Sequence, residues 1–310
     1  MTLPKQKRHI PIKRIIIIAL IVAGGFFVLH RPQQAVEAQP TPPKPAFTAH
    51  VAWPENISAA AIGVQGSGVI ASHNDTKPRP IASIAKLITA MAILEKHPLK
   101  DNDDMGPQIQ ITEADEQLYR DYVAKNGTVV LVKAGVPVTE RDALEAMLLP
   151  SANNFADTTA KWAFGSLKNY RSYATDMLKR LNIHDTTIGI DGSGLDPSTK
   201  STASDLVRIG ELALKNPILA HIVALPAAYV PYAGDIPNYN AMVTKYGYTG
   251  LKPGESVQAG NTLLFSTDQT INGQKMTVVG AILGSAGYHE SDAGALQMVD
   301  TFTKTLKPNN

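Results

Sequence analysis

The 310-residue sequence contains no cysteine, so no disulfide bond can support its fold. Its net charge is only +2, and no basic patch of the kind that binds nucleic acid stands out. Eight histidines are present, but none occurs in an H-E-x-x-H or other metal-ligand spacing. These absences argue against a disulfide-stabilised scaffold, a nucleic-acid-binding protein and a metalloenzyme.

Two common functional motifs are also missing or incomplete. There is no G-x-S-x-G sequence, so a nucleophile elbow is not supported. The stretch "GSGVIA", residues 66–71, has the letters of a dinucleotide-binding fingerprint, but "SHNDTKPRP" follows it where a phosphate-binding helix is needed. We therefore expect a hairpin turn at this position.

The sequence begins with an export signal. Residues 1–14 carry basic side chains without any acid and are predicted to stay in the cytoplasm, while residues 15–29, "IIIIALIVAGGFFVL", contain no polar side chain. This run is shorter than the roughly 20 residues of a full membrane span, and "VEA" at 36–38 is a weak cleavage site. It is a signal anchor or a cleaved signal peptide, and we favour the anchor.

The remaining chain is predicted to lie outside the cytoplasm. Residues 30–50 form a linker that contains the proline-rich stretch "QPTPPKPAF", which favours an extended spacer. Residues 51–310 form the catalytic domain, and a content of 44% apolar and 18% charged residues suits a globular core. The domain is therefore expected outside the cytoplasm, anchored to the cell membrane by the N-terminal segment. If that segment is cleaved, the domain is expected to be secreted.

The pattern along this domain changes from strands to helices and back to strands. Strands are predicted at 59–64, 68–72, 127–132, 259–267 and 275–284. Helices are predicted at 83–97, from 139 onward, and at 153–164, 166–181, 202–215 and 291–306. This order predicts an α+β fold in which the first and last strands share an antiparallel sheet and the middle is a helical insertion.

One ionisable residue, Lys86, lies within the apolar stretch "RPIASIAKLITAMAIL", residues 79–94. Ser83 precedes it by three residues, a spacing that makes two helical side chains neighbours. Burial lowers the pKa of a lysine, so a neutral amine could accept the serine proton and activate the hydroxyl as a nucleophile. The alternative is a lysine that extends along the apolar surface to water, because a four-residue pattern arises easily by chance.

Two further stretches share this chemistry. "LLPSANNFAD", residues 148–157, places Ser151 and Asn153 at a predicted helix N-terminus, where Ser151 could also serve only as an N-cap. "YTGLKPGESVQAGNTLLF", residues 248–265, places Lys252 and Gly254 at a strand just before a second strand, where a simple β-turn with proline at its second position is the alternative. The three stretches together, in this order, point to one catalytic site.

In these stretches the chain resembles the low-molecular-weight D-alanyl-D-alanine carboxypeptidases, which carry S-x-x-K, S-x-N and K-T-G motifs. "DGSGLDPSTKSTASDL" at 191–206 and "PNYNAM" at 237–242 also resemble segments of that family, and the likeness spans about 50–305. It implies a β-lactamase or penicillin-binding transpeptidase-like fold, peptidoglycan stem peptides as substrate, binding of β-lactam antibiotics, and no metal or organic cofactor.

The resemblance also implies roles for individual residues. Ser83 would be acylated and Lys86 would be its general base, while Ser151 and Asn153 would pass a proton to the leaving group and hold the substrate amide. Substrate binding would fall to the third motif and its neighbours, with the Glu255 N–H completing an oxyanion hole formed with the Ser83 N–H. The predicted binding residues are Lys252, Gly254, Glu255 and Ser256.

The third motif departs from the family at Pro253, which stands where relatives have threonine. Proline lacks the hydroxyl that would bind the substrate's terminal carboxylate, and it suits only an edge strand. No arginine follows Arg208, so the basic residue of many relatives is missing as well. Ser256 is the candidate replacement donor.

The leading hypothesis is a membrane-anchored carboxypeptidase that removes the terminal D-alanine. The alternatives are a D,D-endopeptidase, which needs no pocket for a free carboxylate, and a catalytically weak wall-binding or regulatory protein on the same fold. A β-lactamase is less well supported, because no clear Glu-x-x-x-Asn loop follows the second motif.

Overall fold

A computed structural model describes residues 46–309 of the chain. The basic segment 1–14, the apolar run 15–29 and most of the linker 30–50 lie outside the described residues. Among residues 46–309, no helix combines the length and apolar character needed to cross a membrane.

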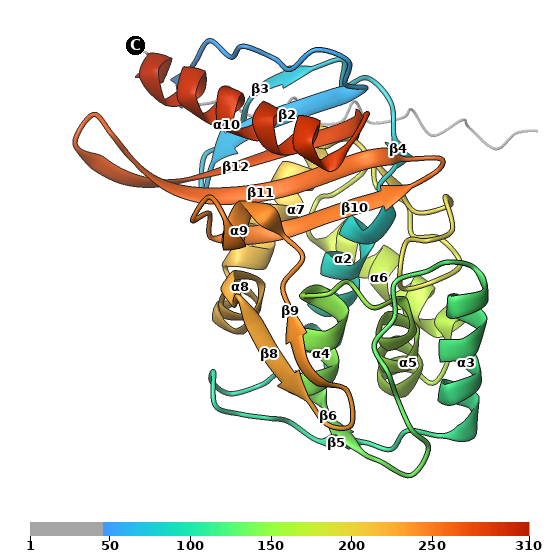
Figure 1. Cartoon of the computed structure of the whole chain (residues 1–310). Helices are drawn as coiled ribbons and strands as arrows, with labels where there is room; N and C mark the ends of the chain where they lie inside the picture. The colour runs from blue at the N-terminus through green and yellow to red at the C-terminus, as the bar shows by residue number, and fades with distance from the viewer. Residues whose placement is uncertain (1–45, 310) are drawn as a thin grey trace, which may run out of the picture. The chain divides into compact units, whose positions relative to one another are not determined.

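The structure is organised around a five-stranded antiparallel sheet (Figure 1). Its strands, in spatial order, are β10 (Gly250–Ser256), β11 (Gly260–Ile271), β12 (Gln274–Ser285), β2 (Ala59–Val64) and β3 (Gly68–His73). The predicted pairing of the first and last strands is confirmed, because β2 pairs with β12. The predicted hairpin turn is also confirmed, because β2 and β3 pair around Gly66 and Gly68, which both have positive φ.

The sheet is covered on both faces, and β2 shows why its sequence suits this place. All six of its residues are buried. Ala60, Ile62 and Val64 pack in one hydrophobic cluster, and Ala59 and Ala61 pack in the other. Successive strand side chains point to opposite faces, so a strand between two cores reads as a continuous apolar run.

Helices occupy the long segment between β3 and β10 and the C-terminus. They are a 3₁₀ turn η1 (Ala82–Ile84), α2 (Ala85–Lys96), α3 (Glu113–Ala124), α4 (Glu140–Leu148), α5 (Asn153–Phe164), α6 (Leu167–Arg180), α7 (Ala203–Leu214), α8 (Pro217–Ala224), α9 (Ala241–Thr244) and α10 (Tyr288–Thr305). Figure 1 shows α10 across one face of the sheet and the helical insertion below the other. The predicted α+β architecture with a helical insertion is confirmed.

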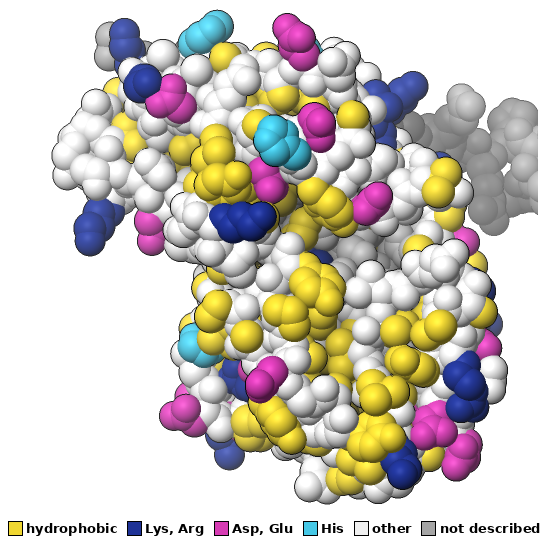
Figure 2. Space-filling model, viewed as in Figure 1, with side chains coloured by type: hydrophobic (Ala, Val, Ile, Leu, Met, Phe, Trp, Pro, Cys, Tyr) yellow, Lys and Arg dark blue, Asp and Glu magenta, His cyan; other side chains and the backbone are white. Residues whose placement is uncertain are grey.

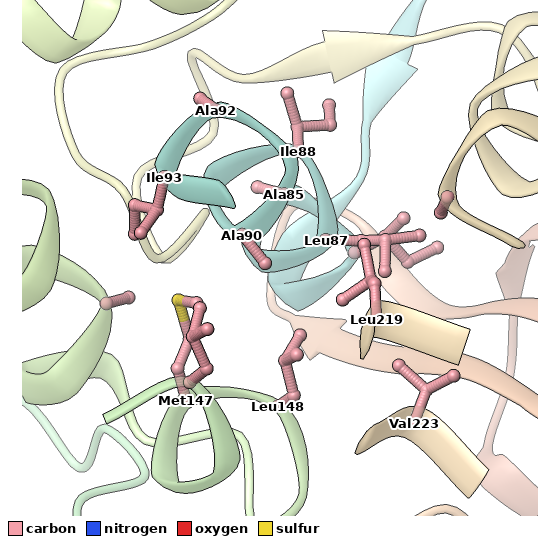
Figure 3. Close-up of a cluster of buried hydrophobic side chains, with 14 of the residues drawn as sticks. Ala85, Leu87, Ile88, Ala90, Ala92, Ile93, Met147, Leu148, Leu219 and Val223 are labelled. Carbon is pink, nitrogen blue, oxygen red and sulfur yellow. The ribbon is translucent and has the colours of Figure 1, made fainter. Parts of the chain in front are cut away.

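Helix α2 lies at the centre of the larger hydrophobic cluster, which fills the insertion and the lower face of the sheet. In Figure 3, Met147 and Leu148 of α4 and Leu219 and Val223 of α8 lie along one side of this helix. From Ala85 to Leu94 every residue of α2 is buried except Met91, which is half-buried, and this enclosure explains why the segment is almost entirely apolar. Its position carries the first predicted motif into the interior.

Four short two-stranded pairs complete the structure: β1 (Phe47–Thr48) with β13 (Lys307–Pro308), β4 (Arg79–Pro80) with β7 (Lys200–Ser201), β5 (Gln108–Ile109) with β6 (Val138–Thr139), and β8 (Ala227–Val230) with β9 (Gly234–Pro237). The expected strand at 127–132 is wrong, because this segment forms no regular secondary structure and pairs with no strand. The side chain of Asn154 bonds both the N–H and the C=O of Val130, at 3.1 and 2.8 Å, in place of a strand partner.

Candidate active site

The first motif is placed by the turn that leads into α2. Ala82 has a positive φ of 46°, an unusual conformation for a residue with a side chain. Ser83 follows within the 3₁₀ turn η1, and Lys86 lies in the first turn of α2. The Nζ atom of Lys86 lies 2.8 Å from the Oγ atom of Ser83, as the three-residue spacing predicted.

Lys86 is fully buried, and its amine is held from three sides. Besides Ser83 Oγ, it donates to Asn153 Oδ1 at 2.6 Å and to the backbone carbonyl of Ser193 at 2.9 Å. Burial lowers the pKa of Lys86 to about 7, against the opposing effect of the Asp191 and Asp157 carboxylates. An amine with this pKa is substantially neutral near neutral pH, so it can accept a proton from Ser83.

The second motif lies where α4 ends and α5 begins. Asn153 is the first residue of α5 and contributes its side chain to Lys86. Ser151 has a φ of 70° and lies before Ala152, the N-cap of α5, so its side chain is not the cap that the simpler interpretation required. Within the described chain, the Ser151 side chain makes no hydrogen bond and is free to contact a ligand.

Lys252 is a second buried lysine and comes from strand β10. Its Nζ donates to the carbonyl of Pro253 at 3.2 Å. Burial lowers its pKa well below the ordinary lysine value, and repulsion from Lys86 acts in the same direction. An anionic group in the cleft would relieve this penalty, because a negative charge favours the protonated amine.

Gly254 brings strand β10 against Ser83. A Cβ atom at this position would lie 2.8 Å from the Ser83 backbone nitrogen, closer than carbon and nitrogen atoms approach. Glycine therefore lets the edge strand run beside the Ser83 N–H, with Glu255 next along the strand, as the predicted oxyanion hole requires. Ser256 accepts a hydrogen bond from the Ala259 N–H at 3.1 Å, which leaves its hydroxyl proton available.

A cleft of about 1000 Å³ joins these residues. Figure 2 shows a hollow between the sheet and the helical insertion. All the predicted site residues line the cleft except Lys86, which lies beneath Ser83. Other lining residues were not singled out from the sequence: Lys125, Tyr239, Tyr288 and Asp292.

Ser193, whose carbonyl oxygen accepts a hydrogen bond from Lys86, was not among the predicted site residues. It lies in "DGSGLDPSTKSTASDL", which was noted only as a family resemblance. A backbone carbonyl can come from any residue type, so the sequence carried no chemical signal for this role.

A buried lysine amine 2.8 Å from a serine hydroxyl, beside the edge strand of a sheet, is the arrangement expected of a serine hydrolase in which a lysine acts as the base. The chain belongs to the D-alanyl-D-alanine carboxypeptidase family of serine peptidases, because the sequence model of that family matches residues 47–286. The structure has the penicillin-binding D,D-transpeptidase fold.

Individual relatives agree with this assignment. A D-alanyl-D-alanine endopeptidase of Pseudomonas aeruginosa is 28% identical over 264 residues, covering 77% of this chain and 75% of that protein. The D-alanyl-D-alanine carboxypeptidase DacB2 of Mycobacterium tuberculosis is 32% identical over 205 residues, covering 63% of this chain and 65% of that protein. The Streptomyces K15 DD-transpeptidase superposes with a TM-score of 0.70 at 21% identity, covering 81% of this chain and 98% of that structure.

Proposed function

We propose that the protein hydrolyses D-alanyl peptide bonds of peptidoglycan stem peptides through an acyl-enzyme on Ser83. The observation that carries this proposal is the 2.8 Å contact between the buried Lys86 amine and the Ser83 hydroxyl. The neutral amine takes the hydroxyl proton as Oγ attacks the carbonyl carbon, and the amine of the next residue leaves with a proton. Water then releases the peptide acid and restores Ser83.

The remaining site residues are suited to proton transfer to the leaving amine and to stabilisation of the oxyanion. Asn153 holds Lys86, and Ser151 presents an unpaired hydroxyl that can pass the proton to the leaving amine. The N–H groups of Ser83 and Glu255 are proposed to stabilise the tetrahedral oxyanion. A β-lactam carries a strained amide in place of the peptide bond and is expected to acylate Ser83 in the same way.

For the bond that is cut, we favour a D,D-endopeptidase acting on cross-links. Pro253 offers no hydroxyl and no N–H to a terminal carboxylate. Two acids, Glu255 and Asp292, line the same cleft and would repel such a carboxylate. Cleavage within a cross-link needs no free carboxylate next to the cut bond. The likeness to relatives named endopeptidases supports this choice.

Carboxypeptidase activity is the second candidate. Lys125 and Lys252 also line the cleft, and either ammonium could bind a terminal carboxylate. The family description and the mycobacterial relative support this reading. The test is to compare kcat/KM on a monomeric pentapeptide and on a cross-linked dimer. We expect the dimer to be preferred, and faster release of terminal D-alanine from the monomer would contradict the endopeptidase assignment.

The chemical step is tested with a fluorescent penicillin. Wild-type protein should be labelled covalently, whereas Ser83→Ala should not be labelled while keeping the wild-type melting temperature. Ser67→Ala, in the β2–β3 turn, is the matched control and should be labelled normally. A wild-type protein that binds peptidoglycan but is never acylated would instead indicate the wall-binding alternative.

We also propose that residues 15–29 anchor the catalytic domain at the outer face of the membrane. The support is the basic flank followed by an apolar run, together with a wall substrate that lies outside the cytoplasm. Fractionation of cells that express the full chain tests this proposal. The intact protein should sediment with membranes and be digested by protease added outside the membrane. A shortened protein released into the medium would show that the leader is cleaved.

A further inference from the structure

A buried polar network lies behind Lys86, on the side away from the cleft. At its centre is Asp157, which is 3% exposed and accepts two hydrogen bonds. The Gly192 N–H donates to its Oδ1 at 2.7 Å, and the Tyr122 hydroxyl donates to its Oδ2 at 2.7 Å. Both bonds go to a side chain that was not predicted to have a role.

These bonds connect Asp157 to the segment that holds Lys86. Gly192 immediately precedes Ser193, whose carbonyl accepts from Lys86 Nζ at 2.9 Å. The Tyr122 hydroxyl also lies 3.4 Å from Ser193 Oγ. A Cβ atom on Gly192 would lie 3.3 Å from Asp157 Oδ1, so a larger residue would push the two segments apart.

Asp157 and Asn153 lie four residues apart in α5, on one face of the helix. Asn153 holds the Lys86 amine directly, at 2.6 Å. Asp157 holds the 191–194 segment, which contacts the amine from another side. One helix therefore fixes the amine twice, once directly and once through a backbone carbonyl.

We propose that Asp157 is a positioning residue for the general base, because it holds the 191–194 segment so that the Ser193 carbonyl keeps the Lys86 amine against Ser83. The inference rests on the proposed function of Lys86 as the base. Asp157 is buried in this network and does not line the cleft, so its effect passes through Lys86.

The same carboxylate affects the charge state of Lys86. The titratable groups around the amine are Asp157 of α5, Asp191 of the adjoining segment and Lys252 of β10. Asp157 and Asp191 raise the pKa of Lys86 and so oppose the effect of burial. The phenols of Tyr122 and Tyr170, whose pKa values burial raises, stay neutral near pH 7. Removing the Asp157 charge should therefore shift Lys86 titration to lower pH.

The experiment follows the titration of Lys86 by NMR in protein carrying ¹³C-labelled lysine, with the signal assigned through Lys86→Arg. Asp157→Asn keeps the shape of the side chain and an oxygen for Gly192, but removes the charge. We expect the Lys86 midpoint to fall by at least about half a unit. Asp205→Asn is the matched control: it removes another buried carboxylate, in α7, and should leave the midpoint unchanged.

A second measurement follows penicillin acylation against pH for the same proteins. In Asp157→Asn the acid limb of the profile of acylation rate against pH should move to lower pH, by the same amount as the NMR midpoint of Lys86. Tyr122→Phe keeps the charge but removes one donor to Asp157, so the rate at the alkaline plateau should fall about threefold with little change in midpoint. If Asp157→Asn does not fold, the plateau rate of Tyr122→Phe still tests whether Asp157 positions Lys86.

Two outcomes would overturn the inference. One is a Lys86 midpoint in folded Asp157→Asn that equals that of Asp205→Asn, and the other is an unchanged plateau in Tyr122→Phe. Failure of the proposed function is distinct, because it would appear as a wild-type protein that penicillin does not acylate. The NMR titration reports on Lys86 in either case.

Discussion

Gly254 shows how closely the third motif approaches the nucleophile. The atoms that a side chain would meet belong to the Ser83 backbone and to Thr262 Oγ1, both at 2.8 Å, so they cannot yield as a flexible chain end would. Thr262 is itself fixed by donation to the carbonyls of Ile81 and Gly254. The width of the site at this point is set by the absence of one methyl group.

Gly254→Ala is therefore expected to reduce the rate of penicillin acylation by about 100-fold, because β10 must move away from the Ser83 N–H. Stopped-flow or gel-based labelling measures the rate. Gly135→Ala is the control: its φ of 83° makes the change a local backbone strain, but a Cβ there meets no atom within 4 Å and the residue lies outside the cleft, so the folded variant should be labelled at the wild-type rate. Equal rates in the two variants would contradict a tight contact at Gly254.

Pro253 is the residue that separates the third motif from K-T-G. Pro253→Thr restores a hydroxyl beside Lys252 and should raise kcat/KM for release of terminal D-alanine by about tenfold, the effect of one charge-assisted hydrogen bond. The measurement is D-alanine release from a pentapeptide. Pro253→Val is the matched control without the hydroxyl, and an equal gain in that variant would attribute the effect to removal of proline alone.

At the scale of elements, most helices and strands followed from the sequence. The helix predicted from residue 139 onward is α4, whose N-cap is Thr139, and a capping box fixes its start, with the Thr139 N–H donating to the Asp142 carboxylate at 2.8 Å. Helix α5 and strand β2 have the predicted bounds. Such elements carry their own signal, because the cap or the apolar period lies within the segment itself.

Other elements depended on distant residues and were missed or wrong. The segment 127–132 reads as a strand, but its partner is the Asn154 side chain and not another strand. Helices α3 and α8 and the β8–β9 hairpin were not predicted. The candidate site was predictable through Ser83, Lys86 and Lys252, whose side chains carry the proposed chemistry. Ser193 was not, because it acts through its backbone.

Helix α4 begins with a buried carboxylate that has no partner. Glu140 is 0% exposed, and neither carboxylate oxygen has a hydrogen-bond partner in the described chain. Burial, with a smaller contribution from Asp104, raises its pKa from 4.5 to about 7. The folded protein thus keeps this proton to higher pH than the unfolded chain, so stability falls as the pH rises from about 4.5 to 7.

Glu140→Gln should therefore raise the free energy of unfolding by about 2 kcal/mol at pH 8 and have little effect at pH 5. Urea unfolding at the two pH values measures the difference. Glu55→Gln, at an exposed site, is the control and should change stability at neither pH. A gain of equal size at pH 5 would show that charge burial is not the cause.

At the scale of the whole described domain, the buried apolar side chains form two hydrophobic clusters. The larger one includes most of α2 and packs beneath the candidate site. The smaller one lies between the sheet and α10 and includes Phe302, which is fully buried. Both contain residues of β2 and β12, so the sheet joins them.

Phe302→Ala should lower the free energy of unfolding by about 3 to 5 kcal/mol through the cavity it leaves. Below its melting temperature, the variant should still be acylated by penicillin at close to the wild-type rate, because Phe302 does not line the cleft. Thermal unfolding and labelling on the same sample provide both values. A large loss of labelling in the folded variant would mean that the two clusters are coupled through the sheet.

Pro253 also bears on how copies of the protein behave toward one another. Strand β10 is the end strand of the sheet and borders an open cleft, a position where a strand from another molecule could add. A proline there withholds one N–H from any such ladder, so the added strand would lose a hydrogen bond at its centre. The proline that is proposed to withhold a substrate contact thus also makes this edge of the sheet a poorer template for aggregation.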